Sequence, residues 1–299
     1  MLYRHAEYLS QQGFDCSIYH PNDPTFRCDW FSHNVNFRSE SYVFQPNRDH
    51  VVIPEIWAAA YHQRFRDKGV PYSIFVQNGY LIDAGVISPD QHLLDSAYYN
   101  AKVVASVSED TTELIKLAFP GLGKDSVLRL YPDFPKFPYL SVEKSKTITY
   151  MPRKLSRHSE RLIFLMRPHL PKDWSFLPID GKSESEVWSM LDSSSIFLSF
   201  SEEEGCPLPP LEAAFAGNIV VGYTGRGAKE YFDEVIFRSV DHDDFNTFVQ
   251  KLIQAMQDVE NGFLQSQACK NQQNHLAKNY SQNKAEELLT NFAEAIENR

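Results

Sequence analysis

Short apolar runs alternate along this chain with segments in which apolar residues recur every three to four positions. The runs have the length and composition of strands, and the segments between them have the amphipathic pattern of helices. This alternation predicts a parallel sheet that is covered on both faces by helices. In the first half of the chain the predicted strands are 15–19, 49–53, 72–77, 102–107 and 126–131, and the predicted helices are 55–67, 88–100 and 109–118.

The alternation is interrupted by the segment from Tyr131 to Lys146. This segment contains three prolines and few periodic apolar positions, which is typical of a linker. We therefore predict two Rossmann-like α/β domains, 1–141 and 142–275. In the second domain the predicted strands are 147–150, 174–178, 195–200, 218–222 and 235–240, and the predicted helices are 159–166, 185–191, 210–216 and 243–259.

Both ends of the chain have the pattern of helices. In the C-terminal part, 276–299, a helix over 283–298 carries an apolar stripe, and it either crosses back to the first domain or caps the second. The N-terminal segment 2–12 is amphipathic and is closed by Gly13, with no strand in front of it. Because the first strand of a doubly wound sheet is central, we expect that the first strand of this domain is missing and that the native chain begins upstream of Met1.

Composition and charge narrow the class of protein. The length of 299 residues suits two domains, and 42% hydrophobic with 23% charged residues is ordinary for a folded protein. A net charge of −10 argues against a nucleic-acid partner, because phosphate binding needs a basic surface. No apolar run reaches the roughly 18 residues of a membrane-spanning helix, and no signal peptide is visible. We expect a cytoplasmic protein and leave peripheral membrane association open.

Neither cysteines nor histidines indicate a metal site. The four cysteines are too scattered for a CxxC pair or a disulfide framework, so we interpret them as reduced thiols. Histidines such as His5 and His158 have no partners at ligand spacing. The acidic run from Asp241 to Asp244 precedes a predicted helix, where it is more simply a cap. The sequence therefore predicts no bound metal.

The segment EEEGCPLPPLEAAFAG, residues 202–217, has the pattern of a ligand-binding turn. It follows a buried-type strand, and Pro209 and Pro210 suit the first turn of a helix, where a missing N–H costs nothing. The loop 203–208 then lies at the carboxyl end of a parallel strand and at a helix N-terminus. Open α/β sheets bind ligands at this edge, and a helix N-terminus favours a phosphate.

Two acids eight positions apart, Glu204 and Glu212, flank this turn. A carboxylate accepts hydrogen bonds from two hydroxyl groups, so acids beside a phosphate site suit the vicinal diols of ribose and of a sugar. The simpler alternative is that the acids 202–204 only complement the helix dipole, which is worth about 0.3 to 1 kcal/mol. The pattern of residues by itself leaves both interpretations open.

The run EGCPLPPLEA, residues 204–213, resembles the Glu-x7-Glu motif EGFGLPxxEA of glycosyltransferase family 4, with Cys206 and Pro207 in place of Phe and Gly. The resemblance implies the GT-B fold, in which two Rossmann-like domains with parallel sheets face each other. It implies that Glu204 is the catalytic-site acid that holds donor-sugar hydroxyls and that Glu212 binds ribose. The turn residues implied to offer backbone groups to the diphosphate and sugar are Gly205, Cys206, Pro207 and Leu208.

A basic segment, MPRKLSRHSER, directly follows the strand 147–150. By itself it is an ordinary basic start of a helix. Beside the acidic motif it resembles the family segment whose Arg and Lys clamp the donor diphosphate, which implies that role for Arg153 and Lys154. Such cations would stabilise the negative charge that develops on the leaving nucleoside diphosphate.

In the first domain, VPYSIFVQNGYLI resembles the family strand that ends in a His near the transferred sugar, but Gln77 and Asn78 occupy that end. Their side-chain amides are our candidates for hydrogen bonds on the acceptor or sugar side. The segment AKVVASVSEDTTELI also resembles the family, although we interpret its Ser108 as an ordinary N-cap.

The sequence thus predicts a retaining, metal-independent glycosyltransferase that needs no cofactor and moves a hexosyl group from a nucleotide diphosphate sugar. Its acceptor would be a glycan or another hydroxyl compound, including a lipid-linked one. The alternative is a non-catalytic sugar-nucleotide or glycan-binding module, which the missing first strand and the missing His would favour. A sugar-nucleotide epimerase lacks support, because we find no catalytic His or acid pair for it.

Overall fold

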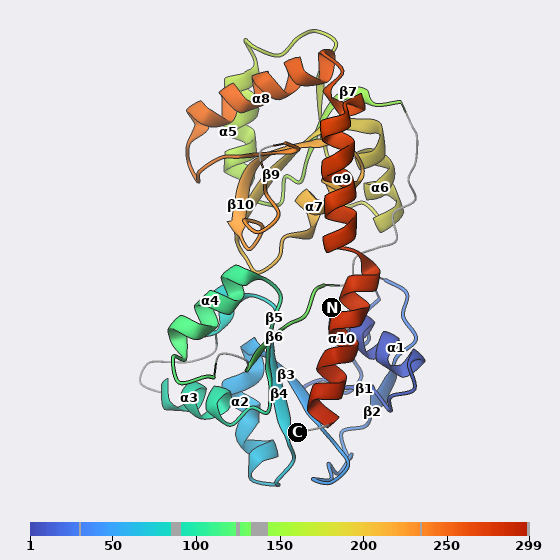
Figure 1. Ribbon diagram of the computed structural model, residues 1–299, viewed down its shortest axis with the longest axis vertical. Helices are drawn as coiled ribbons and strands as arrows, with labels where there is room; N and C mark the ends of the chain where they lie inside the picture. Colours follow the sequence, from blue (N-terminus) through green and yellow to red (C-terminus); the bar gives the residue numbers. More distant parts are fainter. Residues whose placement is uncertain (30, 85–90, 124–125, 133–142, 234, 298–299) are drawn as a thin grey trace. The chain divides into compact units, whose positions relative to one another are not determined.

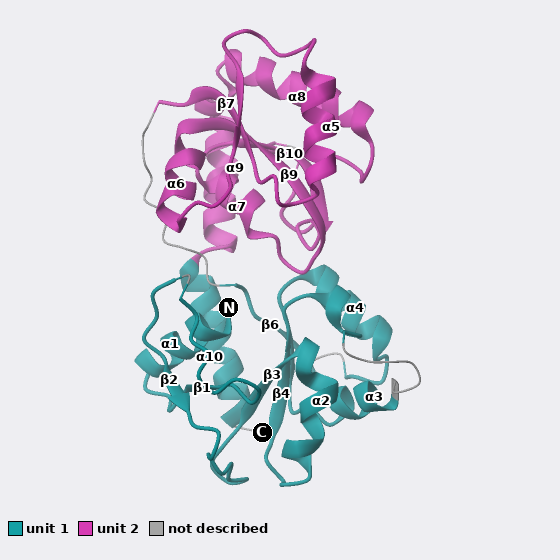
Figure 2. Ribbon diagram, turned by 180° about the vertical axis from the view of Figure 1, so that it is seen from behind, with its two compact units in different colours: residues 1–135, 282–299 teal, residues 136–281 magenta. Residues whose placement is uncertain are grey.

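The computed structural model describes residues 1–29, 31–84, 91–123, 126–132, 143–233 and 235–297 (Figure 1). The chain divides into two compact units, of which unit 1 comprises 1–135 and 282–299 and unit 2 comprises 136–281 (Figure 2). The predicted domain boundary at residue 141 lies outside the described residues. Within the described chain, no helix is long and apolar enough to cross a membrane.

Unit 1 contains a four-stranded parallel sheet in the order β3-β4-β5-β6. Its strands are β3 (Val51–Pro54), β4 (Tyr72–Val76), β5 (Val104–Ser106) and β6 (Val127–Arg129), and its helices are α2 (Glu55–Arg66), η1 (Gly79–Leu81), α3 (Gln91–Tyr99) and α4 (Glu109–Ala118). Apolar side chains of the sheet, among them Ile74, Val76 and Val104, form one core with those of α2 and α4. The predicted helix 88–100 lies partly outside the described residues, and the others agree with the prediction to within about two residues.

A second, two-stranded parallel sheet of unit 1 joins β1 (Ser17–Tyr19) to β2 (Asn36–Arg38). The apolar pattern does not predict β2, because three residues with one apolar side chain give no periodic signal. The helix α1 (Leu2–Gln11) precedes this pair. Unit 1 therefore has two separate sheets in its described residues, where one doubly wound sheet was expected.

The last helix of the chain, α10 (Gln282–Glu297), belongs to unit 1 and lies beside α1 (Figure 1). Its buried side chains include Leu289 and Phe292, two members of the predicted apolar stripe. The hydroxyl groups of Tyr8 and Thr290 lie 3.3 Å apart, and the Nζ of Lys102 donates to the carbonyl of Ile296 at 2.6 Å. Contacts from the middle and from the C-terminal end of the helix thus tie it to the rest of unit 1.

Unit 2 contains a five-stranded parallel sheet in the order β11-β10-β9-β7-β8. The strands are β7 (Ser145–Tyr150), β8 (Ser175–Pro178), β9 (Ser194–Glu204), β10 (Ile219–Arg226) and β11 (Phe237–Ser239). The helices are α5 (Ser156–Met166), α6 (Glu184–Ser193), α7 (Leu208–Phe215), α8 (Phe245–Glu260), η2 (Phe263–Gln265) and α9 (Gln267–Asn279). This arrangement confirms the predicted α/β class with parallel sheets.

The strand β9 continues to Glu204, four residues beyond the predicted end at Phe200. Its extension pairs with β10 across a register shift, where Glu204 lies opposite Arg226. Pairing with a neighbouring strand can carry polar residues into a strand that their own pattern would not predict. As a result, the first acid of the motif lies within the end of a strand rather than in a free loop.

Replacement of Phe292 by Ala should destabilise unit 1 by about 3 to 5 kcal/mol, because this side chain of α10 is only 3% exposed and its loss leaves a cavity. Urea denaturation followed by fluorescence would measure the change. The exposed Glu294→Ala on the same helix is the matched control and should change the free energy of unfolding by less than about 0.5 kcal/mol. Equal stabilities for the two variants would show that α10 does not contribute to the packing of unit 1.

Candidate functional site

The carboxyl edge of the unit 2 sheet carries backbone strain. In the described chain, the non-glycine residues with positive φ are Leu155 (47°), Glu203 (42°), Arg226 (70°) and Asp243 (67°). Leu155 follows β7, and Asp243 follows β11. Glu203 and Arg226 lie at the ends of β9 and β10, so all four residues lie at this edge. Each costs of order 1 kcal/mol and persists only where the surroundings hold it, which is a common feature of ligand sites. The same edge is where open parallel sheets bind ligands.

The turn between β9 and α7 is held by the segment that follows β10. The N–H of Gly227 donates to the carbonyl of Glu204 at 3.1 Å, and the hydroxyl of Tyr231 donates to the carbonyl of Pro207. A Cβ atom on Gly227 would lie 2.0 Å from the carbonyl oxygen of Gly205, so only glycine fits there. Two long-range contacts to backbone therefore fix the path of this turn.

The helix α7 begins at Leu208, two residues before the predicted start at 210, and the two prolines lie in its first turn as predicted. Pro207 is its N-cap residue, and prolines occupy the first turn at positions 209 and 210. Because proline has no N–H group, the first turn leaves fewer amide donors unsatisfied than an ordinary helix does. Leu208, the first residue of α7, retains its N–H group beside the turn, as do Gly205 and Cys206. The positive end of the helix dipole faces the same turn.

Two of the predicted site residues meet at this edge. Lys154, in the turn after β7, donates from Nζ to Oε1 of Glu204 at 2.7 Å. The two side chains are 33% and 23% exposed, so the pair is partly shielded from water but accessible to a ligand. Arg153 is exposed and makes no hydrogen bond or ion pair with the described residues. The edge thus holds two cations and an acid beside a helix N-terminus.

Glu212 lies on α7, one turn into the helix, and has an unusual carboxyl group. Part of its side chain is exposed, yet burial of the carboxyl, together with the smaller effect of the negative charge of Glu184, raises its pKa to about 7. Within the described chain this carboxyl group makes no hydrogen bond. A carboxyl group near half-protonation can both donate to and accept from hydroxyl groups, and such perturbed groups are enriched at functional sites.

The unit 1 candidates Gln77 and Asn78 follow β4, and a residue that the sequence analysis missed holds them. The N–H groups of Gln77 and Asn78 donate to the two carboxylate oxygens of Glu55, at 3.1 and 3.0 Å. Asn78 uses its own side chain to accept from the N–H of Tyr80 at 3.1 Å, which is a structural role. The sequence does contain a signal for Glu55, because it comes two residues after the predicted strand 49–53. This position is at the sheet edge where ligands bind.

The structure confirms two predicted helix caps. Ser108 Oγ accepts from the N–H of Thr111 at 3.1 Å, and Asp244 accepts from the N–H of Thr247 at 3.0 Å. His158, for which the sequence predicts no metal-ligand partner, lies with its Nδ1 3.0 Å from the Tyr223 hydroxyl. In the described part of the chain, no group of three or more His, Cys, Asp or Glu side chains is arranged to hold a metal.

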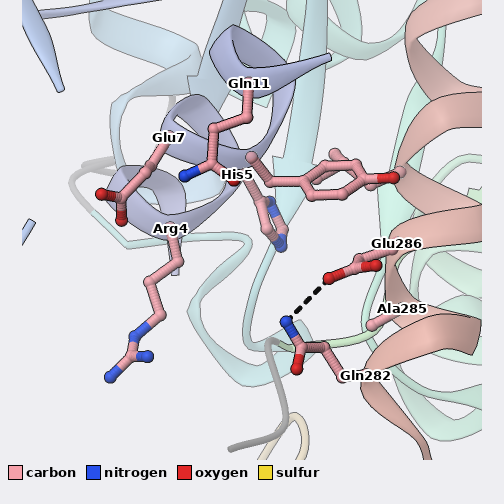
Figure 3. A pocket seen from close by; sticks show the side chains of 9 residues that line it. Arg4, His5, Glu7, Gln11, Gln282, Ala285 and Glu286 are labelled. Carbon is pink, nitrogen blue, oxygen red and sulfur yellow. Dashed lines mark hydrogen bonds between the residues drawn. The ribbon is translucent and has the colours of Figure 1, made fainter. Parts of the chain in front are cut away.

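A separate pocket of about 180 Å³ lies in unit 1 between α1 and α10 (Figure 3). Gln282 donates to Glu286 at 2.7 Å on its wall, and Arg4 and Glu7 also line it. The buried His5 forms part of the lining, and burial, with the charge of the N-terminus, lowers its pKa to about 4. None of the predicted site residues lines this pocket.

Two units with parallel sheets flanked by helices define a protein of the GT-B class, and comparison with solved structures supports this assignment. The chain is similar to HepE of Anabaena in complex with UDP, with a TM-score of 0.64, 11% identity, and coverage of 85% of this chain and 80% of that one. It is also similar to sucrose-phosphate synthase of Thermosynechococcus elongatus, with a TM-score of 0.63, 11% identity, and coverage of 99% and 91%. At such low identity these similarities show the fold.

Sequence comparison adds one curated relative. An alpha-1,6-glucosyltransferase of Actinobacillus pleuropneumoniae serotype 7 (strain AP76) is 27% identical over 223 residues, which cover 72% of this chain. The match spans 66% of that relative's own length. No family model matches the chain. These findings support membership of the glycosyltransferase superfamily, without resolving the family within it.

The raised pKa of Glu212 predicts how stability depends on pH. Between the ordinary value of 4.5 and about 7, the folded chain binds this proton more tightly than the unfolded chain does, so stability falls as pH rises through that window. Glu212→Gln removes this titration. From pH 4 to pH 8, the free energy of unfolding of the variant should therefore rise by about 1 to 3 kcal/mol relative to that of wild type. Denaturation of both proteins at the two pH values would measure it. A stability difference that does not change with pH would contradict the burial of this carboxyl group.

Proposed function

We propose that this chain is a glycosyltransferase that transfers a hexosyl group from a nucleoside diphosphate sugar, of the UDP-hexose class, to a hydroxyl group. The observation that carries the proposal is the β9–α7 turn of unit 2, where the Lys154–Glu204 pair lies beside a helix N-terminus. A diphosphate requires cations and amide donors, and a sugar requires carboxylates. These groups occur together at this sheet edge.

In this proposal each group of the unit 2 site binds one part of the donor. The diphosphate binds at the N-terminus of α7, where the turn residues supply N–H groups and Arg153 and Lys154 supply positive charge. Glu204 accepts hydrogen bonds from hydroxyl groups of the sugar, and Glu212 from those of ribose. The ion pair between Lys154 and Glu204 then holds both side chains in place before the donor arrives, which reduces the ordering that binding requires.

The reaction breaks the bond between the anomeric carbon and the diphosphate oxygen, and it forms a bond from that carbon to the acceptor oxygen. The proton of the acceptor hydroxyl passes to the departing diphosphate. The departing nucleoside diphosphate gains negative charge, which Arg153, Lys154 and the dipole of α7 stabilise. Because these fixed positive groups supply that stabilisation, we propose that transfer needs neither a metal ion nor a cofactor. We also propose that the anomeric configuration is retained, as in the resembled glycosyltransferase family 4.

The comparisons support the choice of donor. The curated relative is named as a glucosyltransferase, and the similar HepE structure contains UDP. The first observation favours a hexose, and the second favours a uridine nucleotide. For the acceptor we propose a glycan or lipid-linked sugar hydroxyl.

A thermal-shift panel tests the donor class. UDP-glucose, UDP-N-acetylglucosamine, GDP-mannose and dTDP-glucose are each added to wild type and to Glu212→Ala. UDP-sugars at about 100 times Kd should stabilise the wild type by about 2.7 kcal/mol, and the effect should be much smaller for the variant, which lacks the proposed ribose ligand. If none of the four raises the melting temperature of the wild type, the donor site proposed here is wrong.

Replacement of Lys154 by Ala should weaken UDP binding about ten-fold or more, because charge-assisted hydrogen bonds to phosphate are worth about 1.5 to 3 kcal/mol. Calorimetric titration with UDP gives the Kd. The matched control is Lys172→Ala, since Lys172 is exposed and makes no contact with the site. If both variants lose the same UDP affinity, the loss comes from the change in overall charge and not from a contact of Lys154 with the phosphate. UDP binding without any UDP release from UDP-glucose would favour the non-catalytic binding module instead.

A further inference from the structure

The pocket between α1 and α10 has room for one small ring-shaped ligand. Its volume is about 180 Å³, and every residue that lines it belongs to unit 1. An engineered cavity of about 150 Å³ in another protein holds a benzene molecule, so one six-membered ring fits here. We propose that this pocket binds a single sugar ring, either as a free monosaccharide or as one residue of a glycan chain. The inference goes beyond the proposed function and does not rest on it, because it needs no residue of unit 2.

The pocket arises where the apolar packing of α10 comes to an end. Leu289 is buried, but one turn earlier Ala285 offers only a methyl group, and the helix begins at the polar Gln282. The two helices therefore leave a gap with polar groups on its walls instead of a packed apolar contact. A polar gap of this size is filled by water or by a polar ligand.

The polar groups of the walls have hydrogen-bonding capacity left for a ligand. Glu7 Oε1 accepts the N–H of Asn34 at 2.8 Å, and Glu286 Oε1 accepts from Gln282 Nε2 at 2.7 Å. Each carboxylate thus retains one oxygen without a partner among the described residues. The side-chain amide of Gln11 makes no hydrogen bond with them either. Carboxylate oxygens accept from hydroxyl groups, and an amide both donates to them and accepts from them.

His5 contributes an uncharged polar group to the same walls. It is only 8% exposed and points from α1 toward Gln282 and Glu286 on α10 (Figure 3). Burial, and to a smaller extent the charge of the N-terminus, lowers its pKa to about 4, so the ring is neutral near pH 7. A hydrogen bond to the backbone of Tyr131 occupies one ring nitrogen. The second ring nitrogen has no partner among the described residues and remains for a hydroxyl group of the ligand.

The charges of the walls disfavour other classes of ligand. The lining contains one cation, Arg4, and two acids, Glu7 and Glu286, so an anion such as phosphate would meet more negative than positive charge. Only Ala285 and Leu289 are aliphatic, which is too little for an apolar ligand. Within the described chain, no group of acids and histidines is arranged to hold a metal. An uncharged compound with several hydroxyl groups meets all of these conditions.

Contacts outside the pocket hold its walls in place. The guanidinium group of Arg4 lies over the ring of Phe31, 5.0 Å from its centroid, and the hydroxyl of Tyr8 lies 3.3 Å from that of Thr290. The bond from Asn34 fixes Glu7 in the same way. Walls that are ordered before the ligand arrives reduce the entropy that binding costs.

Ligand-observed NMR titration of the full chain tests the inference, with glucose, isomaltotriose and the amino acid glutamine as probes. At least one of the two sugars should bind the wild type, and Gln11→Ala should weaken that binding about five-fold, because it removes hydrogen bonds to the ligand. The matched control is Gln12→Ala, the same change at the next residue, which does not line the pocket and should leave the Kd unchanged. Ala285→Leu places a larger side chain in the pocket and should abolish sugar binding. If that variant does not fold, Gln11→Ala carries the test.

The pattern of binding identifies the source of the sugar. Binding of isomaltotriose without glucose assigns the pocket to a residue of a glycan chain, whereas equal affinity for both assigns it to a free monosaccharide. The inference is overturned if neither sugar binds, if Gln11→Ala binds them as tightly as wild type does, or if glutamine is the only probe that binds.

A variant of the candidate donor site separates this result from the proposed function. Glu204→Ala changes unit 2 only, so it should leave sugar binding to the pocket unchanged. A loss of sugar binding in Glu204→Ala would place the sugar in unit 2 and contradict the inference. Failure of the proposed function is seen instead as a wild type that does not bind UDP, and it leaves the sugar titrations unaffected.

Discussion

The geometry of the candidate donor site depends on one close backbone contact, between Gly227 and the turn at Glu204 and Gly205. The two segments approach so closely that no side chain fits at position 227. The hydrogen bond from Gly227 to Glu204 and the bond from Tyr231 to Pro207 complete the contact. Consequently, the position of the acid that pairs with Lys154 is determined by the loop after β10 as much as by the local sequence of the motif. The strained conformations of Glu203 and Arg226 lie on the two sides of this contact, where the surrounding structure can hold them.

Much of this arrangement could be predicted from the sequence, because it follows from local patterns. The prolines 209 and 210 in the first turn of α7, the single strands of the sheets, and the cap at Ser108 each depend on residues within one turn or strand. The contacts that were missed are between residues distant in the sequence. The extension of β9 needs the partner Arg226, and the role of Glu55 needs amides more than twenty residues away. No periodicity in the sequence carries information of that kind, and a resemblance to a short motif carries it only for the motif itself.

Each of the two units keeps a carboxyl group at an energetic disadvantage near the carboxyl edge of its sheet. In unit 1 it is Glu55, which orients two backbone amides, and in unit 2 it is Glu212, whose pKa rises to about 7. Glu55 offsets the cost of its burial with the two hydrogen bonds from Gln77 and Asn78, whereas the Glu212 carboxyl group has no hydrogen bond within the described residues. Perturbed groups of this type are concentrated where ligands bind. Because the chain carries a net charge of −10, its overall field does not attract an anion. An anionic ligand at this edge would therefore depend on local cations such as Arg153 and Lys154.

The departure of the motif from the resembled family can be understood in the same physical terms. Where the family has Phe and Gly, this chain has Cys206 and Pro207, and the proline is the N-cap residue of α7 with φ of −68° and ψ of 114°. A proline fixes that φ without help from a glycine, but it removes one N–H group from the turn. The carbonyl of the same residue accepts the Tyr231 hydroxyl, so the backbone that a flexible glycine would leave adjustable is held by a buried tyrosine. The turn therefore exchanges one amide donor for rigidity, and Gly205, Cys206 and Leu208 keep the N–H groups to which we assign the diphosphate in the proposed function.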